Sequence, residues 1–211
     1  MVAPLDGIRA FHNAFRKDLA AIDAAANAAA QGKGNLDLVL KRYAFYNEVL
    51  VWHAFGEEEY IFPALEKVAP LVAEAYEKDH RGLDTLYEIL DKAVKAADNL
   101  AIARATSAFE FHLRFHLFKE DTHLYRIFAE RIPVPEQAAI AGKLSQKIPP
   151  QRFPEVVTWL FTLIGPQDRE NVTRILKQAL PAPAFAGVTK VIQSAIGNDW
   201  AELTNRIPEL K

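Results

Sequence analysis

Histidine and glutamate occur four residues apart at two places in this sequence, and this spacing is its strongest chemical signal. One pair, His53 and Glu57, lies in WHAFGEEEYIFPALE, and the other, His116 and Glu120, lies in FHLFKED. In an α-helix two side chains four residues apart project from one face, about 6 Å apart along the axis. An imidazole and a carboxylate placed in this way can bind the same metal ion.

Two further histidines lie in helical segments of their own, His12 in AFHNAF and His80 in EKDHRGL. Each has an ordinary alternative, since a single histidine is often a core or surface residue and a His–Glu pair can be a simple i,i+4 contact. Two such pairs on antiparallel helices, with one histidine on each other helix, favour a pair of metal ions. The imidazoles would complete each coordination shell, and the glutamates would bridge the ions and neutralise charge.

The amino-acid composition restricts the metal that such a site could hold. The chain contains no cysteine, which excludes disulfides, thiolate zinc sites and iron–sulfur clusters. Any metal must therefore be held by nitrogen and oxygen donors. These favour iron first, then manganese, with zinc as the third choice.

Four long amphipathic segments are expected to position these side chains. Helical periodicity interrupted by GKGN (32–35) and RIPVPE (131–136) predicts helices over about residues 5–31, 36–68, 70–97 and 99–130. Pro63 should bend or end the second helix, and Asp98 or Asn99 should cap the fourth. No strand pattern is present. The prediction is an all-α fold, an antiparallel up-down four-helix bundle.

A ferritin-like carboxylate site is the rival architecture, because Glu-x-x-His occurs at 77–80 and at 120–123. The first predicted helix contains no glutamate, however, and this arrangement would leave three of the predicted histidine ligands unused. The histidine-rich site accounts for more of the sequence.

The chain changes character beyond about residue 132. KIPPQRFPEVVTWLFTLIG (147–165) and QALPAPAFAGVTKVIQSAIG (178–197) align at an offset of 32 residues, which places Gly165 on Gly197. We expect a C-terminal helical extension built from a tandem unit, with a chance match as the alternative. The predicted domains are a bundle over 1–132 and an extension over 133–211. The extension would pack on the bundle, and it could also contact a protein partner or form a homodimer.

Composition and charge exclude several classes of function. Half of the residues are hydrophobic, a quarter are charged, and the formal net charge is −2, which is typical of a globular protein. This balance gives no basic footprint for nucleic acid or for an anionic membrane. No apolar run approaches the roughly 18 residues of a membrane span, and no targeting segment is evident. We expect a cytoplasmic protein.

The order of these motifs resembles the hemerythrin-like, or HHE cation-binding, family over residues 8–130. HAFGEEEYIFPAL, EKDHRGLDTL and HLFKEDTHLY are similar to segments of that family's second, third and fourth helices. The resemblance implies two non-haem iron ions with an oxo or hydroxo bridge inside a four-helix bundle. Such a centre engages O2, NO or H2O2.

The resemblance also implies a ligand for each position that matches the family pattern. One iron would be held by His12, His53 and Glu57, and the other by His80, His116 and Glu120, with both glutamates bridging. The family's oxygen carriers have a second third-helix histidine four residues after the first, where this chain has Asp84. His112, one turn before His116, is a candidate for the missing nitrogen ligand. This departure puts simple reversible oxygen carriage in doubt.

Four residues are expected to line the pocket or lie next to the ligands, and Asp84 is one of them. Tyr46 and Tyr60 lie seven residues on either side of His53 and so share its helix face. Either could donate a hydrogen bond to a bound oxygen species, although core packing is the more common role. His123 lies about 10 Å beyond His116 along the helix, too far to share its ion easily, and is expected to be structural or to line the pocket.

The function favoured by these features is a di-iron protein that binds or senses O2, NO or iron. The alternative is a di-iron enzyme that decomposes hydrogen peroxide, for which no particular catalytic residue is identifiable. A third hypothesis is that the metal only stabilises the bundle.

Overall fold

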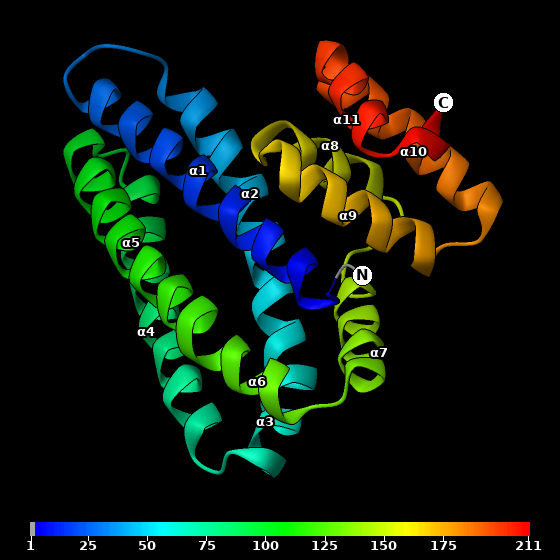
Figure 1. Ribbon diagram of the computed structural model, residues 1–211. Helices are drawn as coiled ribbons and strands as arrows, with labels where there is room; N and C mark the ends of the chain where they lie inside the picture. The colour runs from blue at the N-terminus through cyan, green and yellow to red at the C-terminus, as the bar shows by residue number, and fades with distance from the viewer. Residues whose placement is uncertain (1–2) are drawn as a thin grey trace. The chain divides into compact units, whose positions relative to one another are not determined.

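The structure is a computed structural model that describes residues 3–211, and it contains only helices and connecting turns over that range (Figure 1). The all-α prediction is confirmed. The chain divides into two compact units. The first, the bundle unit, is Phe15–Ile132, and the second consists of the N-terminal segment through Ala14 together with Pro133–Lys211. The expected domain boundary between residues 132 and 133 stays a prediction.

Four long helices form the bundle unit. They are α1 (Leu5–Ala30), whose last sixteen residues belong to this unit, α2 (Leu36–Gly56), α4 (Val72–Lys95) and α5 (Asn99–Lys119). These helices lie side by side and alternate in direction (Figure 1). Their facing apolar side chains form a buried core, which is the main source of stability in a bundle and includes Phe15, Leu19, Tyr46, Phe109 and Leu113.

Each of the two helices that carry a His-xxx-Glu pair is interrupted by one widened turn. The second predicted helix consists of α2, a π-helical segment η1 (Glu57–Ile61) and α3 (Phe62–Val68). The fourth consists of α5, a π-helical segment η2 (Glu120–Leu124) and α6 (Tyr125–Arg131). Pro63 occupies the first turn of α3, where a proline needs no amide hydrogen bond.

Side-chain caps and glycines mark the ends of the bundle helices. The side chain of Asn35 accepts a hydrogen bond from the Asp37 amide at the start of α2, and Asp98 accepts one from Ala101 at the start of α5. Asp98 is therefore the cap of the fourth helix. The turn before α2 contains Gly32 and Gly34 with φ of 72° and 110°, which favour glycine because they lie in the left-handed region.

The second unit contains a run of shorter helices. They are α7 (Val134–Ser145), α8 (Phe153–Leu163), α9 (Pro166–Ala179), α10 (Ala182–Ile196) and α11 (Trp200–Arg206), with short 3-10 turns at Gly197–Asp199 and Pro208–Leu210. Their core includes Val157, Leu160, Phe161, Ile192 and Leu203, together with Ala10 and Ala14 of α1.

The two aligned stretches of this unit adopt the same arrangement, a helix, a glycine turn and a second helix. Matching positions carry matching ion pairs, since Arg174 lies 3.1 Å from Glu170 and Arg206 lies 3.0 Å from Glu202. Arg206 also lies 3.5 Å from Glu170, which joins α11 to α9.

Candidate metal centre

Six of the predicted ligands are buried inside an otherwise apolar core, and none exposes more than 6% of its surface. They form two groups in which donor atoms lie within 4.8 Å of one another. One group is His12, His53 and Glu57, and the other is His80, His116 and Glu120. α1 carries His12 one turn before Phe15, and the remaining residues belong to the bundle unit.

The two glutamates occupy corresponding positions at the start of the widened turns. Glu57 opens η1 and Glu120 opens η2, and each lies one turn after the histidine of its own pair. A π-helical turn contains one additional residue, and such turns are frequent at functional sites. Because each π-helical turn begins at its glutamate, the histidine and glutamate of each pair keep α-helical spacing. The residues after each glutamate are rotated relative to an uninterrupted α-helix.

Glu57 joins the two groups. Its Oε1 lies 3.3 Å from His53 Nε2, and its Oε2 lies 3.6 Å from His80 Nε2. Glu120 lies against its own group, since its Oε1 lies 3.1 Å from His116 Nε2 and 3.9 Å from His80 Nε2. Glu57 is the carboxylate whose contacts reach both groups. One carboxylate thus presents an oxygen to a nitrogen in each group, which is the geometry that a bridging ligand requires.

Carboxylates lie behind two of the histidine rings, and one of them forms a hydrogen bond that orients its ring. His80 Nδ1 donates a hydrogen bond of 2.9 Å to Glu58, which leaves Nε2 facing the site. His116 Nδ1 lies 3.6 Å from Asp79, whose carboxylate also accepts a hydrogen bond from Lys119. A carboxylate behind a histidine ligand orients the ring and raises its basicity toward a metal.

Tyr125 is the site residue that sequence reasoning missed. Its side chain is fully buried, and its hydroxyl donates a hydrogen bond to Glu57 Oε1. Tyr125 follows Glu120 by five residues, one π-helical turn, at the point where η2 becomes α6. An aromatic residue at that distance from the second glutamate is the signal that could have revealed it.

The carboxylates and imidazoles of the site shift one another's pKa values. Burial lowers the pKa of His53, but the adjacent Glu57 carboxylate outweighs this effect and raises it above the usual value. Burial likewise lowers the pKa of His116, and the Glu120 and Asp79 carboxylates raise it to about 10. The pKa of Asp79 falls to about 2, chiefly because it faces the His116 ring.

The donor set fits a pair of metal ions. Four imidazoles and two buried carboxylates carry net negative charge when the histidines are neutral, and such charge is costly in a core without a cation. The raised pKa values of His53 and His116 favour protons on these two imidazoles, which offset it in the metal-free protein. A metal ion would displace those protons, so metal binding should release protons. The same nitrogen and oxygen donors suit iron, manganese or zinc.

The structure does not bring every candidate residue to this cluster. His112 is exposed on α5 with its ring 5.3 Å from that of Phe111, since it lies at the solvent edge of the helix face that carries His116. Asp84 is also exposed and forms a 3.1 Å ion pair with Arg81. Neither His112, a candidate ligand, nor Asp84, a candidate pocket residue, belongs to the two groups of donor atoms.

The remaining candidates lie around the site. Tyr46 is fully buried, and the ring of Phe15 stands 5.6 Å from it and 5.3 Å from His53, so Tyr46 is one aromatic ring removed from the ligands. Tyr60 is half-buried in η1. His123 is exposed, stacks on Tyr76 and places Nδ1 3.0 Å from the Tyr76 hydroxyl.

Comparison with known proteins agrees with this arrangement. The profile of the hemerythrin HHE cation binding domain family matches residues 3–128. The zinc finger protein BRUTUS of Arabidopsis thaliana is 28% identical over 178 residues, which cover 81% of this chain and 14% of that protein. Two BRUTUS-like zinc finger proteins of the same plant are 22% and 24% identical and cover 89% and 97% of this chain.

The chain thus spans only 14–18% of the length of these relatives. No solved structure matches it. Among the residues described, no helix is both long enough and apolar enough to span a membrane.

Proposed function

Since this chain belongs to the hemerythrin HHE cation-binding family, we propose that its two buried groups hold two non-haem iron ions and that the protein binds or senses a small ligand. The ligands that suit such a centre are O2 and NO. Iron itself is a further candidate for the sensed species, because occupancy of the site depends on its availability.

The position of Glu57 is the observation that carries this proposal. Its two oxygens lie 3.3 Å and 3.6 Å from nitrogens of the two different groups. A carboxylate whose role was an ion pair with His53 would make only the first of these two contacts. Two contacts in two directions favour a carboxylate shared between two cations.

The protein's own contribution is an enclosed site of fixed geometry. All six candidate ligands are buried, which excludes bulk water and restricts entry to small molecules. Glu58 orients the His80 ring through a hydrogen bond, and Asp79 places a carboxylate 3.6 Å from His116 Nδ1. When bound, the iron ions would supply redox and Lewis-acid chemistry.

Peroxide decomposition is the second candidate function, and Tyr125 is the observation that favours it. Conversion of two H2O2 to O2 and two H2O requires protons to move between oxygen atoms at the site. The buried Tyr125 hydroxyl, hydrogen-bonded to Glu57, is a donor in the right place to hold such a proton. Tyr76 and His123 form a second hydrogen-bonded pair that reaches the surface.

Two further expectations remain proposals. A protein partner for the C-terminal extension is supported by its tandem helices, which present two similar ion-paired surfaces. A cytoplasmic location is supported by composition alone.

The test is to load the full chain anaerobically with ferrous iron and expose separate samples to O2, NO and H2O2 while recording absorption spectra. Stable new bands with O2 or NO support a binder or sensor. Repeated oxygen evolution from H2O2 supports the enzyme. Iron-loaded protein whose spectrum responds to none of the three would refute both.

A further inference from the structure

α5 carries an exposed apolar stripe along its whole solvent face. Leu100, Arg104, Ala108, Phe111, Phe115 and Phe118 recur at intervals of three or four residues, so they align over about 27 Å. The three phenylalanines expose 67%, 57% and 58% of their surface, and Leu100 exposes 54%. A row of exposed aromatic rings is unusual on a protein surface and marks an interaction site.

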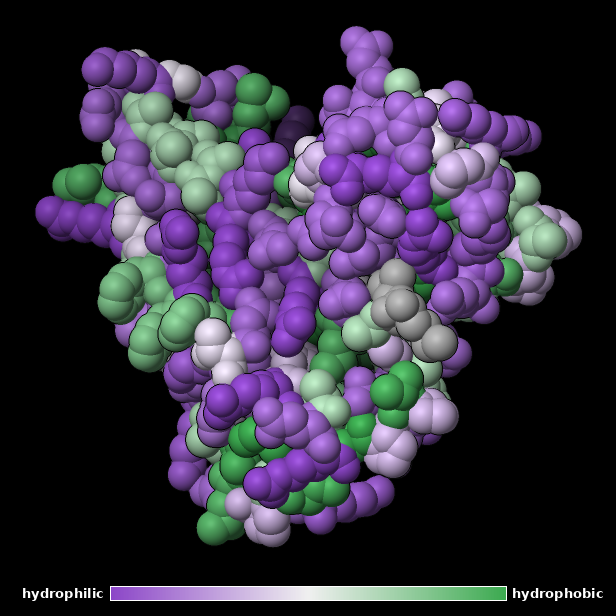
Figure 2. Space-filling model, viewed as in Figure 1, coloured by the Kyte–Doolittle hydropathy of each residue, from purple (hydrophilic) through white to green (hydrophobic). Residues whose placement is uncertain are grey.

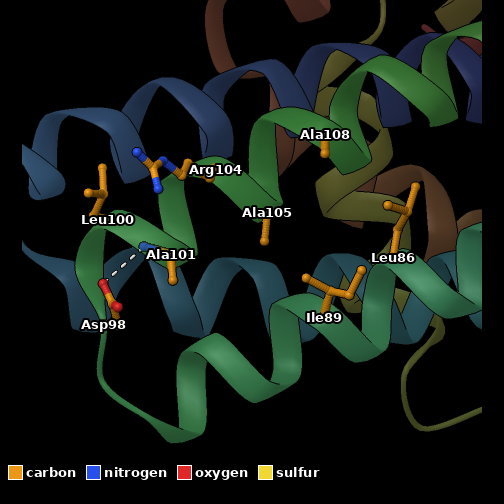
Figure 3. Close-up of a pocket in the computed structure, with 8 residues that line it drawn as sticks. All are labelled: Leu86, Ile89, Asp98, Leu100, Ala101, Arg104, Ala105 and Ala108. Atoms are coloured by element: carbon orange, nitrogen blue, oxygen red, sulfur yellow. Dashed lines mark hydrogen bonds between the residues drawn. The ribbon is translucent and has the colours of Figure 1, made fainter.

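The stripe has two chemically different halves. Its N-terminal half borders a groove of about 340 Å³ between α4 and α5. The floor consists of small side chains of α5, and the opposite wall consists of Leu86 and Ile89 of α4, which point toward α5 (Figure 3). The complete lining is Leu86, Ile89, Asp98, Leu100, Ala101, Arg104, Ala105 and Ala108. The C-terminal half presents the three protruding phenylalanines. Apolar side chains are visible over this side of the bundle unit in Figure 2.

These halves are complementary when two copies of α5 lie antiparallel. A two-fold axis between Ala108 and Phe111 places Phe118 of each copy opposite Ala101 of the other, and Phe115 opposite Arg104. Each copy would thus insert its aromatic rings into the groove of its partner. An interface of this kind is isologous, since the same two elements meet twice.

Arg104 adds a matching electrostatic contact. It is exposed and forms no ion pair with any residue between 3 and 211 that the structure describes. Opposite Phe115 its guanidinium could lie over the aromatic ring, a favourable cation–π arrangement. Lys119 already covers one side of the Phe115 ring at 5.1 Å, which leaves the other side for the partner.

The exposed area corresponds to a weak dimer that forms in a concentration-dependent way. At about 200 Å² per phenylalanine, the exposed fractions correspond to about 360 Å² of aromatic surface in each copy. Two copies together contribute about 730 Å², before the groove lining is counted. The groove lining is too small to bring the total to the roughly 1,000 Å² of a stable specific interface, so the area corresponds to a weak, transient dimer.

We propose that this protein forms a homodimer through α5, in which Phe111, Phe115 and Phe118 of each copy occupy the α4–α5 groove of the other. The dimer interface would thus lie on the bundle unit, and it would not require metal in the site.

The test is sedimentation velocity on the full chain between about 1 and 200 µM, a range that brackets dissociation constants typical of moderate interfaces. We expect concentration-dependent dimers, and Phe118→Glu should weaken association at least tenfold. Phe55→Glu is the matched control, because Phe55 is 56% exposed on α2, outside the stripe. It should leave the dimer unchanged.

A second variant blocks the groove without harming the helix. Ala101→Glu places a carboxylate in the groove, in the first turn of α5, where a negative charge is compatible with the helix N-terminus. It should abolish dimers, as Phe118→Ala should weaken them.

Mixing Ala101→Glu with Phe118→Ala tests the two-fold arrangement itself. The mixture retains one intact ring-and-groove contact per heterodimer, so it should associate more tightly than either variant alone. A monomer at every concentration, a dimer weakened only by Phe55→Glu, or a mixture no tighter than its components would overturn the proposal.

Discussion

At the scale of single residues, the hydrogen bond from Tyr125 to Glu57 separates this site from a simple set of metal ligands. Tyr125→Phe removes a hydroxyl that donates to a buried carboxylate, so the free energy of unfolding of the metal-free protein should fall by about 1.5–3 kcal/mol. Urea denaturation measures this change. Tyr87→Phe, at a half-buried position of α4 away from the metal site, is the control. Equal losses in the two variants would argue against a special role for Tyr125.

Glu58 has a different role, since it orients His80 and does not face the site. Glu58→Gln weakens the acceptor of the 2.9 Å hydrogen bond from His80 Nδ1, and metal affinity should fall about 10–100-fold. Competition with a chromogenic chelator measures it. Glu77→Gln, an exposed carboxylate on the same helix α4 as His80, should leave the affinity unchanged, and a similar loss in both variants would contradict the assignment.

The pKa of His116 predicts how the metal-free protein responds to pH. The folded pKa is raised to about 10, above the usual value of about 6.5. The proton therefore binds the folded state more tightly, so this contribution to stability is complete below pH 6.5 and disappears as the pH rises through 10. Unfolding free energies measured at pH 6 and pH 9.5 should differ less in His116→Gln than in the parent chain. His112→Gln, at an exposed position, should reproduce the parent difference.

At the scale of elements, the N-terminal cap stabilises α5, the helix that carries His116 and leads into Glu120 at the start of η2. Asp98→Ala removes the side chain that accepts the Ala101 amide and should cost about 1 kcal/mol of stability. Thermal denaturation of the metal-free protein measures it. Asp98→Ser retains a capping oxygen and should recover most of the loss. Full stability in Asp98→Ala would show that packing alone fixes this end of α5.

The sequence patterns located the four helices and the two His-xxx-Glu pairs because both depend on local periodicity. They could not locate η1 and η2, because a π-helical turn is stabilised by packing from other helices. The predicted helix faces of the residues after each glutamate therefore assume continuous α-helix, whereas the structure has a π-helical turn there. This is why Tyr60 was expected beside His53 while Tyr125, five residues after Glu120, was overlooked. The exposure of His112 has another cause. It lies one turn from the buried His116, and spacing alone cannot distinguish the buried centre of a helix face from its exposed edge.

At the scale of the whole molecule, membership of the hemerythrin HHE cation-binding family, the buried charge of the site and the bridging position of Glu57 converge on one claim, that this chain binds two metal ions. Bound metal should also stabilise the fold, since it binds the native site and not the unfolded chain. Its removal by a chelator should therefore lower the melting temperature.

The most direct test of that claim is elemental analysis of the full chain after anaerobic loading with ferrous iron and removal of loosely bound metal. We expect two iron ions per chain, and we expect Glu57→Ala to lose most of both, because that carboxylate is shared. A chain that retains no metal would refute the two-ion site, as would unchanged iron content in Glu57→Ala.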